Sequence, residues 1–116
     1  MHFLSDALEG YIRDHSEDEP KLLQELTRET HLKVVQPRMI TGHFQGRVLS
    51  MLSKIIQPKN ILEIGSYTGY SAICLSEGLQ KGGQLHTIDI NEELTDIQRR
   101  YFDKSGLGEQ IMQHTG

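Results

Sequence analysis

The stretch Asn60–Asp89, NILEIGSYTGYSAICLSEGLQKGGQLHTID, decides the fold of this 116-residue chain. It opens with a short apolar run over 60–64, which predicts a strand, and apolar residues then recur at helical spacing over 71–79. Two glycines at 82–83 form a turn, and the β-branched and apolar run 84–90 predicts a second strand. A strand, a helix and a second strand in this order indicate a parallel sheet with a right-handed crossover.

The same alternation continues toward the end of the chain. Residues 92–104 form an amphipathic pattern that predicts a helix, with Gly106 as its stop, and 110–114 reads as a third strand. The sequence therefore predicts an α/β fold whose βαβαβ half spans 58–116. The run 60–64 is apolar on both faces, so a doubly wound sheet of these three strands would leave it as an exposed edge.

Helices are predicted before the first strand. Ser5 suits the N-cap of a first helix, and Pro20 suits the first residue of a second. A third helix carries a broad apolar face over 48–56 and stops before Pro58. Residues 33–45 have no clear period but are too apolar for a solvated linker, so we expect a loop that folds over something.

We expect a single domain over 1–116, with a helical cap and covering loop in 1–57 and a cofactor-binding half in 58–116. The net charge of −4 argues against a dedicated nucleic-acid binder. The single cysteine, Cys74, excludes an internal disulfide and a zinc site of several cysteines. No apolar stretch approaches the roughly 18 residues of a membrane span, and the first residues do not resemble a signal peptide, so we predict a cytoplasmic protein.

The candidate site lies where the first strand is followed by its helix, in the string EIGSYTGYS over 63–71. Gly65 and Gly69 allow the backbone to approach a ligand closely, and the free N–H groups of the following helix suit an anion. Asp89 ends the second strand, 20 residues after Gly69, where an acid accepts hydrogen bonds from two ribose hydroxyls. The expected ligand is a nucleoside that carries a small anionic group.

Two cofactor classes compete for this site. The dinucleotide fingerprint G-x-G-x-x-G, started at Gly65, fails because its second and third glycine positions hold Tyr67 and Tyr70. A phosphate-binding loop is absent because no lysine follows Gly69.

S-adenosylmethionine fits better because it has no pyrophosphate to cradle. Its carboxylate can lie at the helix N-terminus near Ser71, and its ammonium can lie near Glu63. Its ribose would take Asp89, and Ile90 would lie beside the adenine.

The chain resembles the cation-dependent O-methyltransferases of the catechol and caffeoyl-CoA type. The segment ILEIGSYTGYSAICLSEGL is similar to the first motif of that family, and LHTIDI is similar to the second. The run MITGHFQGRVLSMLSKI resembles the loop and helix that cover cofactor and substrate. The resemblance implies the Rossmann-like fold of S-adenosylmethionine-dependent methyltransferases, with the parallel sheet preceded by N-terminal helices.

The resemblance also implies residue roles. Tyr67 would lie against the methyl donor, and Met39 and Ile40 would border the acceptor pocket. Thr41 would contact the cofactor from the covering loop, and Ser66 would help to hold the methionine end. The full set expected to bind the cofactor is Thr41, Glu63, Gly65, Ser66, Tyr67, Gly69, Ser71, Asp89 and Ile90.

The implied reaction is metal-assisted methyl transfer to a hydroxyl of a small catechol-like or phenolic acceptor. In the family, a divalent cation (Mg, Mn or Ca) is held on later strands, beyond residue 116, so no metal ligand and no catalytic residue is assigned here. We therefore expect these residues to form the N-terminal part of a homodimeric enzyme and to be catalytically silent alone. The alternatives are a tRNA hydroxyuridine O-methyltransferase of the same family and a non-catalytic nucleoside-binding module.

Overall fold

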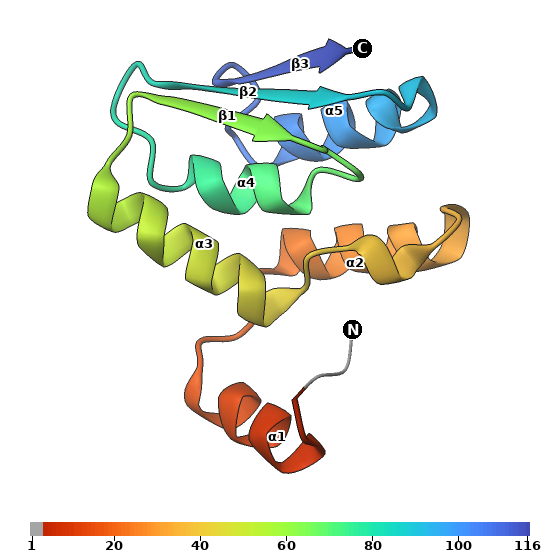
Figure 1. The fold of residues 1–116 in the computed structure, drawn as a ribbon, viewed down its shortest axis with the longest axis vertical. Coiled ribbons are helices and arrows are strands. Elements are labelled where there is room, and N and C mark those ends of the chain that lie inside the picture. The colour runs from red at the N-terminus through yellow and green to blue at the C-terminus, as the bar shows by residue number, and fades with distance from the viewer. Residues whose placement is uncertain (1–3) are drawn as a thin grey trace.

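Three parallel strands form one sheet in the computed structural model, which describes residues 4–116. They are β1 (Asn60–Ile64), β2 (Gln84–Asp89) and β3 (Ile111–Thr115), in the order β1-β2-β3. Their carboxyl ends meet at one edge of the sheet (Figure 1). The predicted parallel α/β architecture is confirmed.

Two crossover helices cover one face of this sheet (Figure 1). They are α4 (Tyr70–Ser76) and α5 (Thr95–Lys104), and a 3-10 turn, η2 (Glu92–Leu94), leads into α5. Every second strand residue points toward these helices, which gives the alternating burial of β1 and β2. The largest fully buried side chains of the core are Tyr70, Phe102, Leu23, Leu26, Leu85 and Ile111.

The N-terminal helices form a further layer beneath α4 and α5 (Figure 1). Helix α2 (Lys21–Lys33) packs against both, and α3 (His43–Ile56) packs against α4. Between them, the covering loop holds a 3-10 turn, η1 (Pro37–Met39). Helix α1 (Asp6–His15) stands apart and buries none of its residues.

Helix α3 does not bury the apolar face that its sequence predicts. Its buried residues are Gly46, Ser50 and Ser53, because α3 and α4 cross closely. A Cβ at Gly46 would lie 2.7 Å from Cε1 of Tyr70, so only a small residue fits the crossing. Of the large apolar side chains, Leu49 packs partly buried against the core. The large side chains that remain exposed are Phe44, Met51, Leu52, Ile55 and Ile56.

Several element boundaries differ from the predicted ones. The helix expected over 71–79 ends at Ser76, and the covering loop ends sooner because α3 begins at His43. Pro20 is the N-cap of α2 and not its first residue. Ser5 caps α1 as predicted, since its hydroxyl accepts the N–H of Leu8 at 3.2 Å.

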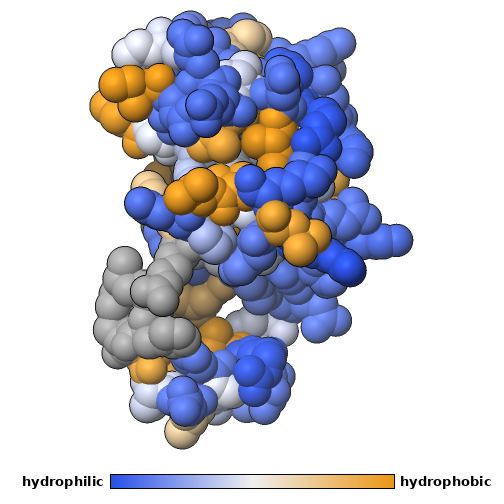
Figure 2. Space-filling view, turned by 90° about the vertical axis from the view of Figure 1, so that its right-hand side faces the viewer, coloured by the Kyte–Doolittle hydropathy of each residue, from blue (hydrophilic) through white to orange (hydrophobic). Residues whose placement is uncertain are grey.

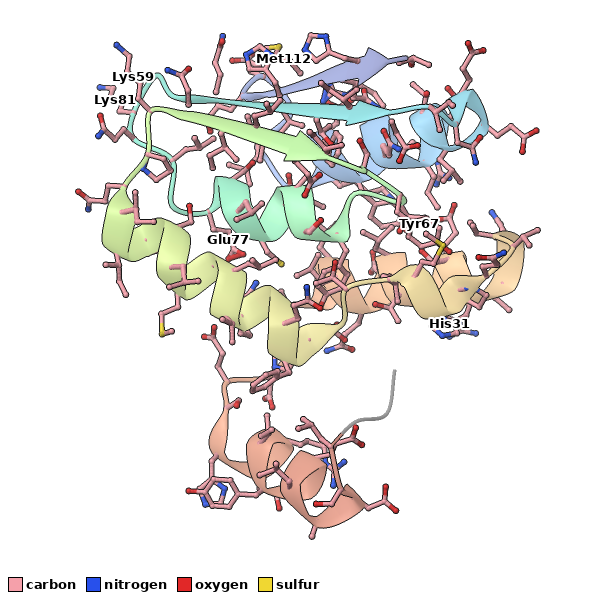
Figure 3. All side chains as sticks on the ribbon, in the orientation of Figure 1. His31, Lys59, Tyr67, Glu77, Lys81 and Met112 are labelled. Carbon is pink, nitrogen blue, oxygen red and sulfur yellow. The ribbon has the colours of Figure 1, made fainter. Side chains whose placement is uncertain are left out.

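The second face of the sheet carries no helix of the described residues (Figure 1). Leu62 and Ile64 on this face are 66% and 83% exposed. Met112 lies on the same face, above the sheet in Figure 3. Among the described strands, β1 pairs with β2 alone, so the predicted exposed edge is present in this part of the chain. Hydrophobic side chains also reach the surface in separate patches elsewhere (Figure 2). Within residues 4–116, no helix has the length and apolar character needed to cross a membrane.

Candidate functional site

The loop from β1 to α4 turns back on itself through left-handed residues. Gly65, Tyr67 and Gly69 have φ angles of 94°, 45° and 99°. A Cβ on Gly65 would meet nothing within 4 Å, so this glycine faces open space. A Cβ on Gly69 would lie 2.7 Å from Cε1 of Phe102, so this glycine is needed for packing against α5.

Asp89, at the end of β2, holds this loop in place. Its Oδ2 accepts the N–H groups of Ser66 and Tyr67, each at 2.9 Å, and its Oδ1 accepts the N–H of Asn91 at 3.0 Å. Burial acts to raise the pKa of Asp89, but the backbone N–H groups of Asn91, Tyr67, Ser66 and Ile90 outweigh it and the pKa lies below its usual value. Asp89 is therefore an ionised, fixed hydrogen-bond acceptor at neutral pH.

Glu63 points from β1 toward α4 and is 8% exposed. Its carboxylate accepts the hydroxyls of Ser71 at 2.6 Å and Thr87 at 2.8 Å, and the hydroxyls of Thr87 and Ser66 lie 2.5 Å apart. Burial raises the pKa of Glu63, the two hydroxyls that it accepts act to lower it, and the charge of Asp89 raises it further. The structure thus brings three of the predicted residues, Glu63, Ser66 and Ser71, into one buried polar cluster.

A cavity of about 700 Å³ opens on the outer side of the loop. Four of the predicted residues line it, namely Met39, Gly65, Tyr67 and Asp89. Its volume lies within the range of about 300–1,000 Å³ that is common for small-molecule sites. It lies at the carboxyl edge of the parallel sheet, where ligands bind in open α/β folds.

The covering loop is attached to the glycine loop through Tyr67. The Tyr67 hydroxyl donates to the carbonyl oxygen of Gln36 at 2.7 Å and lies 3.3 Å from that of Val35. Figure 3 shows Tyr67 between the end of β1 and α2. Gln36 itself has a left-handed φ of 60°. One face of the cavity is thereby closed by the chain between α2 and α3.

The other predicted residues lie outside the cavity wall. Thr41 and Ile40 follow η1 in the covering loop, and Ile40 packs against the core. Ile90 follows β2 with 83% of its surface exposed, at the same edge of the sheet. Their roles toward a cofactor or acceptor stay predictions, as do those of the cavity-lining residues.

Sequence reasoning missed the part of the wall that α2 and α5 contribute. Glu29 and Arg100 form an ion pair there, and the hydroxyl of Tyr101 donates to Glu29 at 2.9 Å. Asn91 also lines the cavity and caps η2 through its side chain. Only Asn91 has a local signal, because Asn is a favoured N-cap residue directly after a strand; the ion pair joins residues far apart in the sequence.

Two side chains of α4 pack in the core next to the site. Tyr70 is 2% exposed and Cys74 is fully buried, both on α4. Tyr70 also donates its hydroxyl to Glu19, and Arg47 pairs with Glu17 at 3.2 Å. The acidic run 16–19 is therefore partly held by ion pairing and hydrogen bonding to α3 and α4.

The sequence matches a known protein family. A family model described as O-methyltransferase matches residues 13–116. The chain belongs to this O-methyltransferase family. Curated relatives include the caffeoyl-CoA O-methyltransferase of Petroselinum crispum, 39% identical, and caffeoyl-CoA O-methyltransferase 2 of Petunia hybrida, 40% identical, each over 109 residues. These alignments cover 92% of this chain and 45% of each relative, so the chain spans less than half the length of these relatives.

Solved structures of methyltransferases share the fold. An O-methyltransferase from Bacillus cereus in complex with SAH is 30% identical with a TM-score of 0.85, and the match covers 95% of this chain and 50% of that one. An SAH-bound methyltransferase from Podospora anserina is 27% identical with a TM-score of 0.85, covering 96% and 48%. The predicted methyltransferase fold is confirmed.

Proposed function

We propose that this chain forms the S-adenosylmethionine-binding part of an O-methyltransferase that acts on a hydroxyl of a small phenolic, catechol-like acceptor. The observation that carries the proposal is the Gly65–Tyr67 loop, bound through its N–H groups to ionised Asp89 and open on a cavity of about 700 Å³. The names of the caffeoyl-CoA relatives and of the SAH-bound Bacillus cereus structure support the acceptor class and the cofactor.

The residues of this chain suit the parts of that cofactor. Asp89 would accept the ribose hydroxyls, since a carboxylate held ionised makes strong hydrogen bonds. The open space at Gly65 would admit the cofactor backbone. Glu63 and Ser71, which are hydrogen-bonded to each other, would contact the methionine end of the cofactor. Ile90 would lie beside the adenine.

Bound S-adenosylmethionine supplies an electrophilic methyl group on a sulfonium sulfur. The work of this chain would be to orient that methyl group and to exclude water from it, with Tyr67 and Met39 in the cavity wall.

The proposal assigns metal assistance to other parts of the whole protein. Residues 4–116 contain no group of three or more His, Cys, Asp or Glu side chains that could hold a metal ion. The residues described here therefore do not fit a divalent-cation site. We also propose that the whole protein is a homodimer.

Calorimetry on the whole protein tests the cofactor. We expect S-adenosylhomocysteine to bind and NAD to give no signal, because the loop lacks the dinucleotide glycines. Asp89→Ala should weaken binding by about 1–3 kcal/mol, since it leaves ribose hydroxyls without their acceptor. The matched control is Asp18→Ala, an exposed acid outside the cavity wall, which should bind as the wild type does. Unchanged affinity in Asp89→Ala contradicts the ribose assignment.

A methyl-transfer assay tests the reaction. Catechol and a caffeoyl thioester should be methylated with Mg²⁺ present, and EDTA should abolish the activity if a metal assists. Transfer to unmodified or hydroxylated tRNA in place of these acceptors would show the tRNA-modifying alternative. Cofactor binding without transfer to any hydroxyl would show a non-catalytic nucleoside-binding module.

A further inference from the structure

Tyr67 is the strained point of the glycine loop. Its φ of 45° lies in the left-handed region, which side chains other than glycine rarely adopt, so outside contacts must hold it there. Asp89 accepts its N–H, and its hydroxyl donates to Gln36. Its carbonyl oxygen is the remaining polar group, and a side chain of α5 binds it.

Gln98 supplies that contact from a position that is 3% exposed. Its Nε2 donates to the carbonyl oxygen of Tyr67 at 2.6 Å. Its Oε1 accepts from Nε2 of Gln113 on β3 at 2.9 Å, and the same Nε2 donates to the carbonyl oxygen of Thr95 at 3.1 Å. A relay of two amides, one buried and one half-buried, thus joins β3, α5 and the glycine loop.

The chemistry of the relay sets the orientation of Gln98. A backbone carbonyl only accepts, so Gln113 must turn its NH₂ group toward Thr95 and Gln98. Gln98 must then offer its oxygen to Gln113, which leaves its own NH₂ group facing Tyr67. Each amide therefore has one favourable orientation, and flipping either one would set like groups against each other.

We propose that Gln98 is a positioning residue for cofactor binding, acting through the carbonyl of Tyr67. Gln98 does not line the cavity, whereas Gly65, Tyr67 and Asp89 do. With Gln98 behind the loop and Asp89 in front of it, both polar groups of the Tyr67 backbone are held, and the loop keeps the shape that presents Gly65 to the cavity. This inference rests on the proposed function.

The test compares two glutamine-to-methionine variants of the whole protein. Gln98→Met keeps the length of the side chain but removes the donor to Tyr67. We expect its dissociation constant for S-adenosylhomocysteine to rise about tenfold, the effect of one lost buried hydrogen bond. The control is Gln110→Met, which removes a weaker contact to the carbonyl of Gly83, 3.3 Å long, at the opposite end of β3. It should leave the dissociation constant unchanged.

A second variant separates positioning from packing. In Gln98→Glu, the carboxylate sets an acceptor against the Tyr67 carbonyl at neutral pH, whereas the protonated acid can donate to it. Affinity should therefore recover toward the wild-type value as the pH falls, with the wild type measured in parallel. A role in packing alone would not produce this pH dependence.

Hydrogen exchange gives a measurement that needs no cofactor. In the free protein, the amides of Ser66 and Tyr67 should lose protection in Gln98→Met and keep it in Gln110→Met. Unchanged protection, or equal cofactor affinity in Gln98→Met and the wild type, overturns the inference. A wild type that binds no cofactor refutes the proposed function instead, and the exchange result then decides the positioning of the loop by itself.

Discussion

At the scale of single residues, two glycines of one loop are required for different reasons. Both have φ above 90°, but Gly65 faces open space and Gly69 faces the fully buried ring of Phe102. Gly69 thus has a packing role besides the predicted role in ligand approach, which stays a prediction. Any side chain at Gly69 must displace a core aromatic ring, so a valine there would disturb the fold and not only cofactor binding.

Alanine at each glycine separates these two roles. Both variants carry the left-handed backbone penalty of about 1–2 kcal/mol. Gly69→Ala adds a clash with Phe102, so urea unfolding should show it to be the less stable variant by about 1–3 kcal/mol. Gly65→Ala should lose more affinity for S-adenosylhomocysteine, measured by calorimetry. Equal stability of the two variants would contradict the packing role of Gly69.

At the scale of elements, Glu29 joins α2 to α5. It forms an ion pair with Arg100 and accepts a hydrogen bond from the hydroxyl of Tyr101. Its Oε2 lies 3.7 Å from Nζ of Lys33. The pKa of Glu29 is lowered most by the hydrogen bond from Arg100, and burial acts against this. The hydrogen bond from Tyr101 and the positive charges of Arg100 and Lys33 also lower the pKa, which falls to about 2. The folded protein thus binds the Glu29 proton more weakly than the unfolded chain does.

This pKa difference predicts a pH dependence of stability. The contribution of ionised Glu29 to the free energy of unfolding is fully present above the unfolded pKa of about 4.5. It is lost as the pH falls toward the folded pKa of about 2. Glu29→Gln should therefore lower the free energy of unfolding at pH 7 and flatten its fall between these pH values, as followed by denaturant titration. Glu25→Gln, an exposed acid on the same helix, serves as the control. Identical pH curves for wild type and Glu29→Gln would disprove the coupling.

At the scale of the whole molecule, one face of the sheet and the edge formed by β1 have no cover from residues 4–116. Leu62 and Ile64 point outward from β1, and β1 has a single neighbouring strand. An apolar edge strand favours pairing with other chains. We therefore expect the 116-residue chain to self-associate, with sedimentation velocity showing a mass that rises with concentration.

Polar substitutions on that face test its part in the association. The pair Leu62→Thr and Ile64→Thr should shift the chain toward the monomer. Val35→Thr, at a residue that is 83% exposed in the covering loop, removes exposed apolar surface away from the sheet and should leave the association unchanged. A wild-type chain that stays monomeric at high concentration would show that the exposed face does not drive association.

Local patterns in the sequence determined the fold class and the centre of the site. Strand and helix periods, turn glycines and the acid that ends β2 each depend on neighbours close in the chain, so they predict the parallel sheet and place Gly65 and Asp89 at its edge. Tyr67 was added by the family resemblance, and it lines the same cavity. Helix ends were predicted less well, since tertiary contacts and caps decide the last turn.

The tertiary structure alone decided which surfaces are buried and what supports the loop. It buried the small residues of α3, because the close crossing with α4 leaves no space for the large ones. It also placed Glu63 in a polar cluster and brought Gln98 to the backbone carbonyl of Tyr67, 31 residues away in the sequence. Such contacts depend on how elements pack in three dimensions, and no local period or spacing encodes them.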